Sequence, residues 1–274
     1  MSRIVQICPV GFEFHRVLEG VRIHPSNVIY LLRSFKKEVK KSDPDAHLID
    51  IANNYVEKLY KHFTRSNTFT EVQVRDTSII SYMDAIRELC SIIKREFDIG
   101  DVETIYINTS TSNKLFVSVA MYVGSFFPEI IKLFYLRSSR YTINHILDDN
   151  VEKDEIKNIF TEYGMTYKKE GESYQNIDIP IYPIQVLSQE NQVILKTLND
   201  LHTNSGEWVT FMNLLKNMGE DEKDKKIKMK YSHHIKKLKQ QILMEEKVHG
   251  RQKSYRLTEA GKVLGLIYSY FQLN

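Results

Sequence analysis

The sequence of 274 residues has little cysteine and no long apolar run, and both absences narrow its class. Only Cys8 and Cys90 occur, without a CxxC pair or a Cys/His cluster, so we expect neither a disulfide framework nor a structural zinc site. No stretch approaches the roughly 18 to 20 apolar residues of a membrane span. Residues 1–9 also lack the charged start and long apolar stretch of a signal peptide. The sequence therefore predicts a cytoplasmic protein without a membrane partner or a metal.

Charge is unevenly distributed along a chain whose formal net charge is only +3. Residues 186–274 carry 15 Lys and Arg against 10 Asp and Glu, whereas residues 1–185 carry 23 against 25. Residues 225–256 alone hold 11 basic and 2 acidic side chains. A local field of this sign attracts the phosphates of nucleic acid. We therefore expect a nucleic-acid surface in the C-terminal part.

Short apolar runs alternate with amphipathic helical stripes over residues 1–136. The expected strands, which are rich in β-branched and aromatic residues, cover residues 3–8, 27–32, 69–74, 103–107 and 130–135. Between them, apolar residues recur at helical spacing, as at Leu48, Tyr55 and Phe63. This alternation predicts an α/β fold with a Rossmann-like, doubly wound and mostly parallel sheet.

Residues 137–185 have a weaker pattern and are expected to extend this core and link it to the next domain. Asp154 to Tyr163 predicts a helix. Ile177 to Ile184 alternates like a strand, but its two prolines restrict it to a sheet edge or an extended linker. We place the domain boundary near Val186, where the charge balance changes.

Residues 186–274 predict three helices, a two-stranded hairpin and a closing helix. The third helix has an apolar face that includes Tyr231, Ile235 and Leu238, and the residues between them are basic or polar. Residues 244–248 and 254–257 are expected to pair about a turn. This order predicts a winged helix-turn-helix, which lays its third helix in the major groove of DNA.

The predicted DNA contacts lie on the outer face of the third helix and at the hairpin tip. Lysines there would bind phosphates, while short polar side chains would reach base edges. The alternative is a solvated helix face on which lysines are merely abundant. The predicted DNA-binding residues are Lys228, Lys230, Ser232, His233, Lys236, Lys237, Lys239, Arg251 and Lys253.

A polar turn follows the expected strand at residues 103–107. It reads Asn-Thr-Ser-Thr-Ser-Asn-Lys from Asn108 to Lys114 and leads into a predicted helix. The carboxyl end of a parallel strand opens into a crevice, and the next helix offers unpaired N–H groups to an anion. We expect Ser110, Thr111 or Ser112 to cap that helix and the other hydroxyls to face a phosphate with Lys114. The alternative is a well-capped helix with a solvated lysine.

Residues 9–12 predict a second turn, between the first strand and a short helix. Gly11 would let a ligand approach the backbone closely, or would simply allow a tight turn. The turn has no GxGxxG motif, and Leu32-Arg33 stands where an acidic residue would end the second strand of a dinucleotide-binding fold. Both features count against a dinucleotide-binding regulator, which remains a third hypothesis.

The two turns resemble the signature turns of CARF domains, the CRISPR-associated Rossmann-like sensors. Pro9-Val10-Gly11-Phe12-Glu13 follows the first strand. Asn108-x-Ser110-x-x-x-Lys114 fits the family pattern of Asp or Asn, any residue, Ser or Thr, three residues, then Lys or Arg. With a winged helix-turn-helix after them, the chain resembles the archaeal-type CARF transcriptional regulators. The resemblance divides it into a sensor core at 1–136, an extension and linker at 137–185 and a DNA-binding domain at 186–274.

The resemblance implies a homodimer that binds one cyclic oligoadenylate, a tetra- or hexa-adenylate, and regulates transcription in CRISPR antiviral defence by binding double-stranded DNA. Ser110 and Thr109 would hold phosphate, Lys114 would neutralise it, and Asn108 would bond a ribose hydroxyl or a base edge. Phe12 would pack near an adenine or belong to the core. The predicted ligand-binding residues are Pro9, Val10, Gly11, Phe12, Asn108, Thr109, Ser110, Thr111, Ser112, Asn113 and Lys114.

A metal-independent ring nuclease that cleaves the bound cyclic oligoadenylate is the main alternative. Some CARF domains are similar to this chain and do so by aligning a ribose hydroxyl with the adjacent phosphorus. Lys114 and Ser110 would then be the catalytic residues. Only Glu13 and His15 stand near the turns as candidate bases, so the leading hypothesis is a sensor without a catalytic residue.

Overall fold

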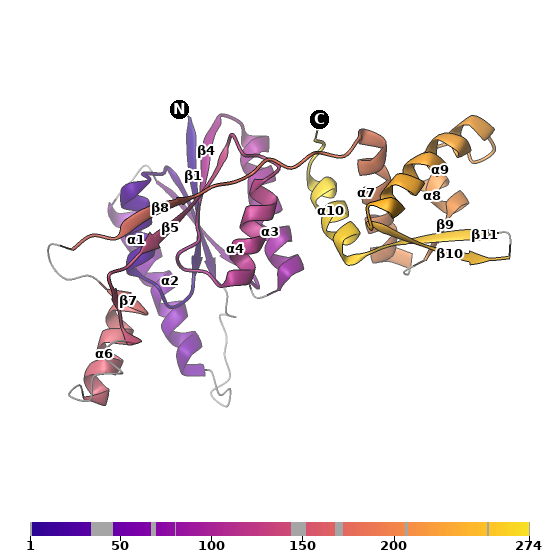
Figure 1. Ribbon diagram of the computed structural model, residues 1–274. Coiled ribbons are helices and arrows are strands. Elements are labelled where there is room, and N and C mark those ends of the chain that lie inside the picture. Colours follow the sequence, from indigo (N-terminus) through magenta and orange to yellow (C-terminus); the bar gives the residue numbers. More distant parts are fainter. Residues whose placement is uncertain are drawn as a thin grey trace. The chain divides into compact units, whose positions relative to one another are not determined.

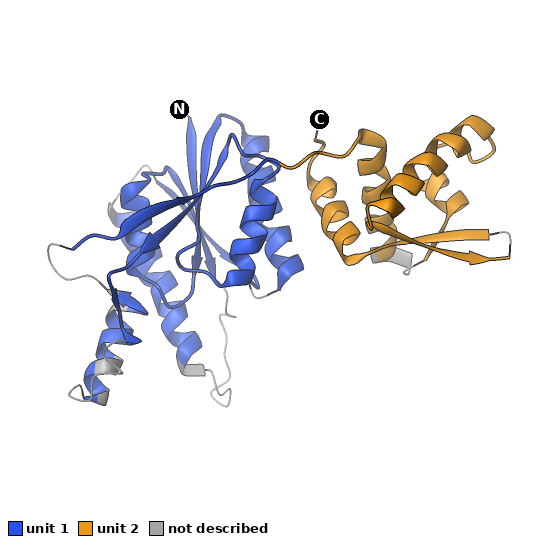
Figure 2. Ribbon diagram, in the orientation of Figure 1, with its two compact units in different colours: residues 1–183 blue, residues 184–274 orange. Residues whose placement is uncertain are grey.

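The computed structural model describes residues 2–33, 46–66, 70–79, 81–143, 152–167, 172–205, 208–250 and 252–273. The chain divides into two units, Met1–Pro183 and Ile184–Asn274 (Figure 2). This division lies close to Val186, near which the change in charge balance suggests a boundary. Each unit has its own sheet and its own buried side chains.

A six-stranded sheet forms the centre of the N-terminal unit (Figure 1). Its order is β3-β2-β1-β4-β5-β8, with β1 to β5 parallel and β8 antiparallel to β5. The strands are β1 Arg3–Val10, β2 Val28–Arg33, β3 Glu71–Asp76, β4 Val102–Asn108, β5 Ile131–Arg137 and β8 Gln175–Ile179. The prediction of a Rossmann-like, mostly parallel α/β sheet is confirmed.

Helices cover both faces of this sheet (Figure 1). They are α1 His15–Ile23, α2 Ala46–Ser66, α3 Tyr82–Ile99 and α4 Lys114–Gly124. On one face, Cys8, Ile29 and Leu31 pack against α1 and α2 in a cluster that includes Val17 and Tyr55. The helices α3 and α4 lie on the opposite face. The central strands are nearly continuous apolar runs because helices cover their side chains on both faces of the sheet.

The first strand is longer than expected, because Pro9 and Val10 belong to β1 rather than to the following turn. Pairing of β1 with β4 ends at Ile7, whereas pairing with β2 continues to Val10. The Pro9 carbonyl faces the β4 side, where it accepts a bond from Thr111. Pro9 has no N–H to donate to a neighbouring strand. It is tolerated here because no residue of β4 pairs with it.

The extension beyond β5 adds two short strands and a helix. β6 Arg140–Tyr141 pairs with β7 Thr166–Tyr167, and α6 Lys153–Tyr163 lies between them in sequence. Gly164 follows α6 with a φ of 85°, a conformation that favours glycine. The N–H of Met165 donates to the Phe12 carbonyl at 2.8 Å, so this extension is joined to the turn after β1.

The C-terminal unit consists of helices around a small antiparallel sheet of order β10-β11-β9. Its elements are α7 Gln189–Ser205, β9 Val209–Thr210, α8 Phe211–Asn217, α9 Lys225–Gln240, β10 Met244–His249, β11 Gln252–Leu257 and α10 Glu259–Tyr270. Tyr231, Ile235 and Leu238 of α9 are buried, as the spacing predicts. In the part of the chain that the structure describes, no helix is long and apolar enough to cross a membrane.

Asn108, at the end of β4, is fully buried beneath α1. Its Nδ2 donates to the Arg16 carbonyl at 3.1 Å, and its Oδ1 accepts from the Ser110 N–H at 3.0 Å. The helix can approach because Gly20 has no side chain: a Cβ there would lie 2.6 Å from Asn108 Nδ2 and 3.2 Å from the Phe134 ring. Asn108 thus joins β4, α1 and the polar turn.

Replacement of Gly20 with alanine should destabilise the N-terminal unit by about 1 kcal/mol or more. Alanine gains about 1 kcal/mol in helix propensity, but overpacking costs about 1 to 3 kcal/mol. If Asn108 moves aside, each of its two hydrogen bonds that is lost costs about 0.5 to 1.5 kcal/mol more. Denaturant unfolding measures the change. Ser118→Ala, at an exposed position of α4, should stay within about 0.5 kcal/mol of wild type. Equal stability of Gly20→Ala and wild type would contradict the expected crowding.

Candidate functional site

The candidate ligand site lies where β1 and β4 end side by side. The chain leaves them toward opposite faces of the sheet, and ligands of doubly wound sheets bind at such a switch point. Thr111 links the two turns, since its Oγ1 donates to the Pro9 carbonyl. Its own carbonyl lies 3.5 Å from the position of a Cβ on Gly11. The fold therefore brings together the two turns that the sequence indicates.

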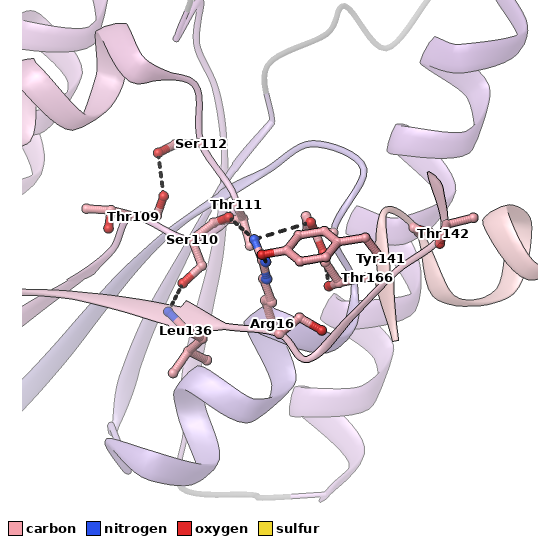
Figure 3. A network of polar contacts seen from close by, with 12 residues as sticks. Arg16, Thr109, Ser110, Thr111, Ser112, Leu136, Tyr141, Thr142 and Thr166 are labelled. Carbon is pink, nitrogen blue, oxygen red and sulfur yellow. Dashed lines mark hydrogen bonds and ion pairs between the residues drawn. The ribbon is translucent and has the colours of Figure 1, made fainter. Parts of the chain in front are cut away.

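The hydroxyls of the polar turn bond to the protein backbone (Figure 3). Thr109 donates to the Phe134 carbonyl at 2.8 Å, and Ser112 donates to the Thr109 carbonyl at 2.9 Å. Ser110 Oγ accepts the N–H of Leu136 at 2.7 Å. These bonds fix the turn against β5. Contact of these hydroxyls with a phosphate stays a prediction, as does contact of the fully buried Asn108 with a sugar or base.

Asn113 caps α4, so the expectation that Ser110, Thr111 or Ser112 caps this helix is wrong. The Asn113 Oδ1 accepts from the N–H of Phe116 at 2.8 Å. The hydroxyls that were expected to cap are bonded to the backbone of β5, β1 and the turn itself, and α4 begins only at Lys114. An asparagine at this position serves the cap as well as serine does.

Lys114 is the exposed cation of the site. It is the first residue of α4, a helix whose first turn has no acidic side chain. Within the described residues, no carboxylate forms an ion pair with it. A cation at a helix N-terminus adds to the positive end of the dipole, which is unfavourable unless an anion is near. Lys114 and the helix start therefore form a position at which an anion would be stabilised.

Phe12 is partly buried and packs against other aromatic and apolar side chains. Its ring lies 5.8 Å from that of Phe160 in α6. It also contacts the apolar cluster beneath α1 and α2. Of the two interpretations of Phe12, this packing favours the core over an adenine contact.

Sequence reasoning missed Arg16 and considered Glu13 only as a candidate base. Both are buried next to the turn, and Glu13 Oε1 lies 3.4 Å from Arg16 Nη1. Thr166 of β7 donates to Glu13 Oε2 at 2.6 Å. Burial raises the pKa of Glu13 to about 7, although Arg16 and the bond from Thr166 act in the opposite direction. The sequence did contain a signal for this pair, because Glu13 and Arg16 have opposite charges, lie three residues apart and are surrounded mostly by apolar residues.

A groove of about 860 Å³ lies beside α9 in the C-terminal unit. The start of α8 and the hairpin β10–β11 form its other walls. Glu246 of β10 faces it and forms ion pairs with two lysines, at 2.7 Å from Lys239 and 3.4 Å from Lys253. The hydrogen bond from Lys239 chiefly lowers the pKa of Glu246. The predicted DNA-binding residues that line the groove are Lys228, Ser232, Lys236, Lys239 and Lys253.

The remaining predicted DNA contacts lie elsewhere. His233 and Lys237 are exposed on α9 outside the groove lining, and Lys230 forms an ion pair with Glu190 at 3.2 Å. Arg251 falls outside the described residues.

His234, next to His233, hydrogen-bonds the Asn191 side chain at 3.0 Å, and burial lowers its pKa. Among the side chains that the structure describes, no group of His, Cys, Asp and Glu could hold a metal ion.

Comparison with solved structures gives distant likenesses. The chain is similar to Enterococcus italicus Csm6 bound to cyclic hexa-2'-fluoro-hexa-dAMP, with 10% identity, a TM-score of 0.39, and coverage of 89% of this chain and 55% of that one. It is also similar to Can2 from Sulfobacillus thermosulfidooxidans in complex with cyclic tetra-adenylate, with 10% identity, a TM-score of 0.33, and coverage of 97% and 62%. The chain thus spans less than two thirds of the length of either.

Comparison at the level of families is more specific. No curated protein matches the chain. A family model described as "HFX_2341_N:-like, N-terminal" matches residues 4–141, which is half of the chain and includes the polar turn and the turn after β1. The chain therefore belongs to the HFX_2341_N:-like, N-terminal family.

Proposed function

We propose that this protein is a transcriptional regulator whose C-terminal unit binds double-stranded DNA and whose N-terminal unit binds a cyclic oligoadenylate. The basic groove beside α9 is the observation that carries the proposal. Four of its lining residues are lysines, and they come from both the helix and the hairpin. Lysines converging from two elements suit a phosphate backbone passing between them.

The arrangement of the C-terminal unit supports a winged helix-turn-helix. Its elements follow one another in the order of that motif, namely α7, β9, α8, α9 and the β10–β11 hairpin. β9 pairs with β11, which closes the small sheet behind the helices. In such a unit α9 is the recognition helix and the hairpin is the wing. The exposed Ser232 and His233 are then placed for base edges, and the lysines for phosphates.

The N-terminal unit offers an anion site of a kind that suits a phosphodiester ring. Lys114 and the start of α4 supply positive charge at the switch point, and Gly11 in the neighbouring turn adds no side chain there. The resemblance of both turns to those of CARF domains supports a cyclic oligoadenylate as the ligand. Because each chain has one such turn, we also propose a homodimer that holds the ring across a two-fold axis.

Neutralising two groove lysines should weaken DNA binding and its dependence on salt. In the double variant Lys228→Gln with Lys236→Gln, the slope of log affinity against log salt should fall by about 2, since each phosphate contact contributes about 0.9. Fluorescence anisotropy with a labelled duplex over a salt series measures this. Lys196→Gln, an exposed lysine of α7, should leave the slope unchanged. A double variant with the wild-type slope would remove the groove from the proposed DNA site.

A cyclic oligoadenylate should raise the thermal stability of the protein through Lys114. A ligand present at 100 times its dissociation constant stabilises the folded state by about 2.7 kcal/mol. We expect one ring size, cyclic tetra- or hexa-adenylate, to produce this shift in wild type and in Lys58→Ala, whose lysine is exposed on α2. Lys114→Ala should lose most of it. No shift with either ring, or an equal shift in Lys114→Ala, would argue against the proposed ligand site.

A further inference from the structure

Arg16 of α1 is a buried cation that holds the polar turn from below (Figure 3). Its side chain is almost fully enclosed, and the residue is only 4% exposed. Nη1 donates to the Ser110 carbonyl at 2.9 Å, and Nη2 donates to the Tyr141 hydroxyl at 3.4 Å. The guanidinium carbon also lies 5.3 Å from the centre of the Tyr135 ring. Two tyrosines and one carboxylate thus hold Arg16 in a single orientation.

The bond from Arg16 determines the direction of the peptide between Ser110 and Thr111. In a trans peptide, the carbonyl and the following N–H point in opposite directions. Because the Ser110 carbonyl points toward the guanidinium, the Thr111 N–H points away from it. That N–H has no hydrogen-bond acceptor within the described residues. The other polar groups of Ser110 are bonded to Asn108 and Leu136, so the peptide cannot easily rotate.

We propose that Arg16 is the positioning residue of the ligand site, which holds the Thr111 N–H toward a phosphate oxygen of the ligand. This inference rests on the proposed anion site and adds the donor and the residue that orients it. An oriented backbone N–H beside Lys114 and the α4 N-terminus gives an anion a fixed geometry as well as charge. Arg16 itself does not need to touch the ligand.

The neighbouring Glu13 makes a variant of Arg16 feasible. Removing a buried cation normally leaves its carboxylate partner charged and unpaired, which is strongly destabilising. Burial raises the pKa of Glu13 to about 7 even though Arg16 lowers it, so the carboxyl of a variant without Arg16 is uncharged at about pH 6. Circular dichroism at that pH checks that the variants are folded.

The test compares Arg16→Met, Arg16→Lys and the control Lys58→Ala, whose lysine is exposed on α2. Isothermal titration with cyclic tetra- and hexa-adenylate should show affinity on the order of tenfold lower for Arg16→Met. Arg16→Lys should recover part of the loss, and Lys58→Ala should bind like wild type. In ¹⁵N-resolved NMR spectra, the Thr111 amide should shift on binding in wild type but not in Arg16→Met. The inference would be overturned if Arg16→Met bound the ring with wild-type affinity and showed the same ligand-induced Thr111 shift as wild type.

A titration with inorganic phosphate separates this inference from the choice of ligand. If wild type binds neither ring, the proposed ligand is wrong, and phosphate becomes the probe of the Thr111 amide. A phosphate-induced shift in wild type that disappears in Arg16→Met supports the role of Arg16. The same shift in both proteins, or in neither, contradicts it.

Discussion

The candidate ligand site depends on the buried amide of Asn108. This side chain uses its donor on the backbone of α1 and its acceptor on the backbone of the polar turn, at the end of the central strand β4. A buried amide without these partners would cost about 1 to 3 kcal/mol for each unsatisfied group. Gly20 allows the close approach, and Arg16, one turn earlier in α1, then reaches the Ser110 carbonyl. The shape of the turn is therefore determined by the packing of α1 on the sheet.

This arrangement separates residues that shape the site from residues that face a ligand. Thr109, Ser110 and Thr111 are buried, and their hydroxyls bond to the backbones of β1 and β5. Lys114 is exposed at the start of α4. A rigid backbone that presents N–H groups binds an anion with little reorganisation, because the protein has already ordered its donors. The signature residues then matter mainly through the geometry that they impose on the backbone.

The polar turn is connected through the sheet to the end of the N-terminal unit. Ser110 bonds to Leu136 of β5, and Leu136 pairs with Asn176 of β8, the edge strand. The strand β8 ends at Ile179, and the chain enters the C-terminal unit at Ile184. This series of contacts links the polar turn to the segment that leads into the C-terminal unit.

Sequence periodicity predicted the parallel sheet, because strands buried on both faces and amphipathic helices carry strong signals. It located the polar turn between a strand and a helix, and it predicted helix boundaries within a few residues. It did not predict the roles of Arg16 and Glu13, since an i,i+3 charge pair normally marks a solvated helix face and only tertiary packing buries it here. It also assigned the cap of α4 to a hydroxyl, because the competing backbone acceptors of Ser110, Thr111 and Ser112 are visible only in the folded chain.

The central claim is that a ligand of the N-terminal unit controls DNA binding by the C-terminal unit. The most direct measurement is the dissociation constant for a labelled duplex with and without saturating cyclic tetra- or hexa-adenylate. We predict a change of about 5-fold or more with one ring, in either direction, and an equal change in ring affinity when DNA is present, because coupling between two binding sites is reciprocal. An unchanged DNA affinity while the ring is bound would contradict the account.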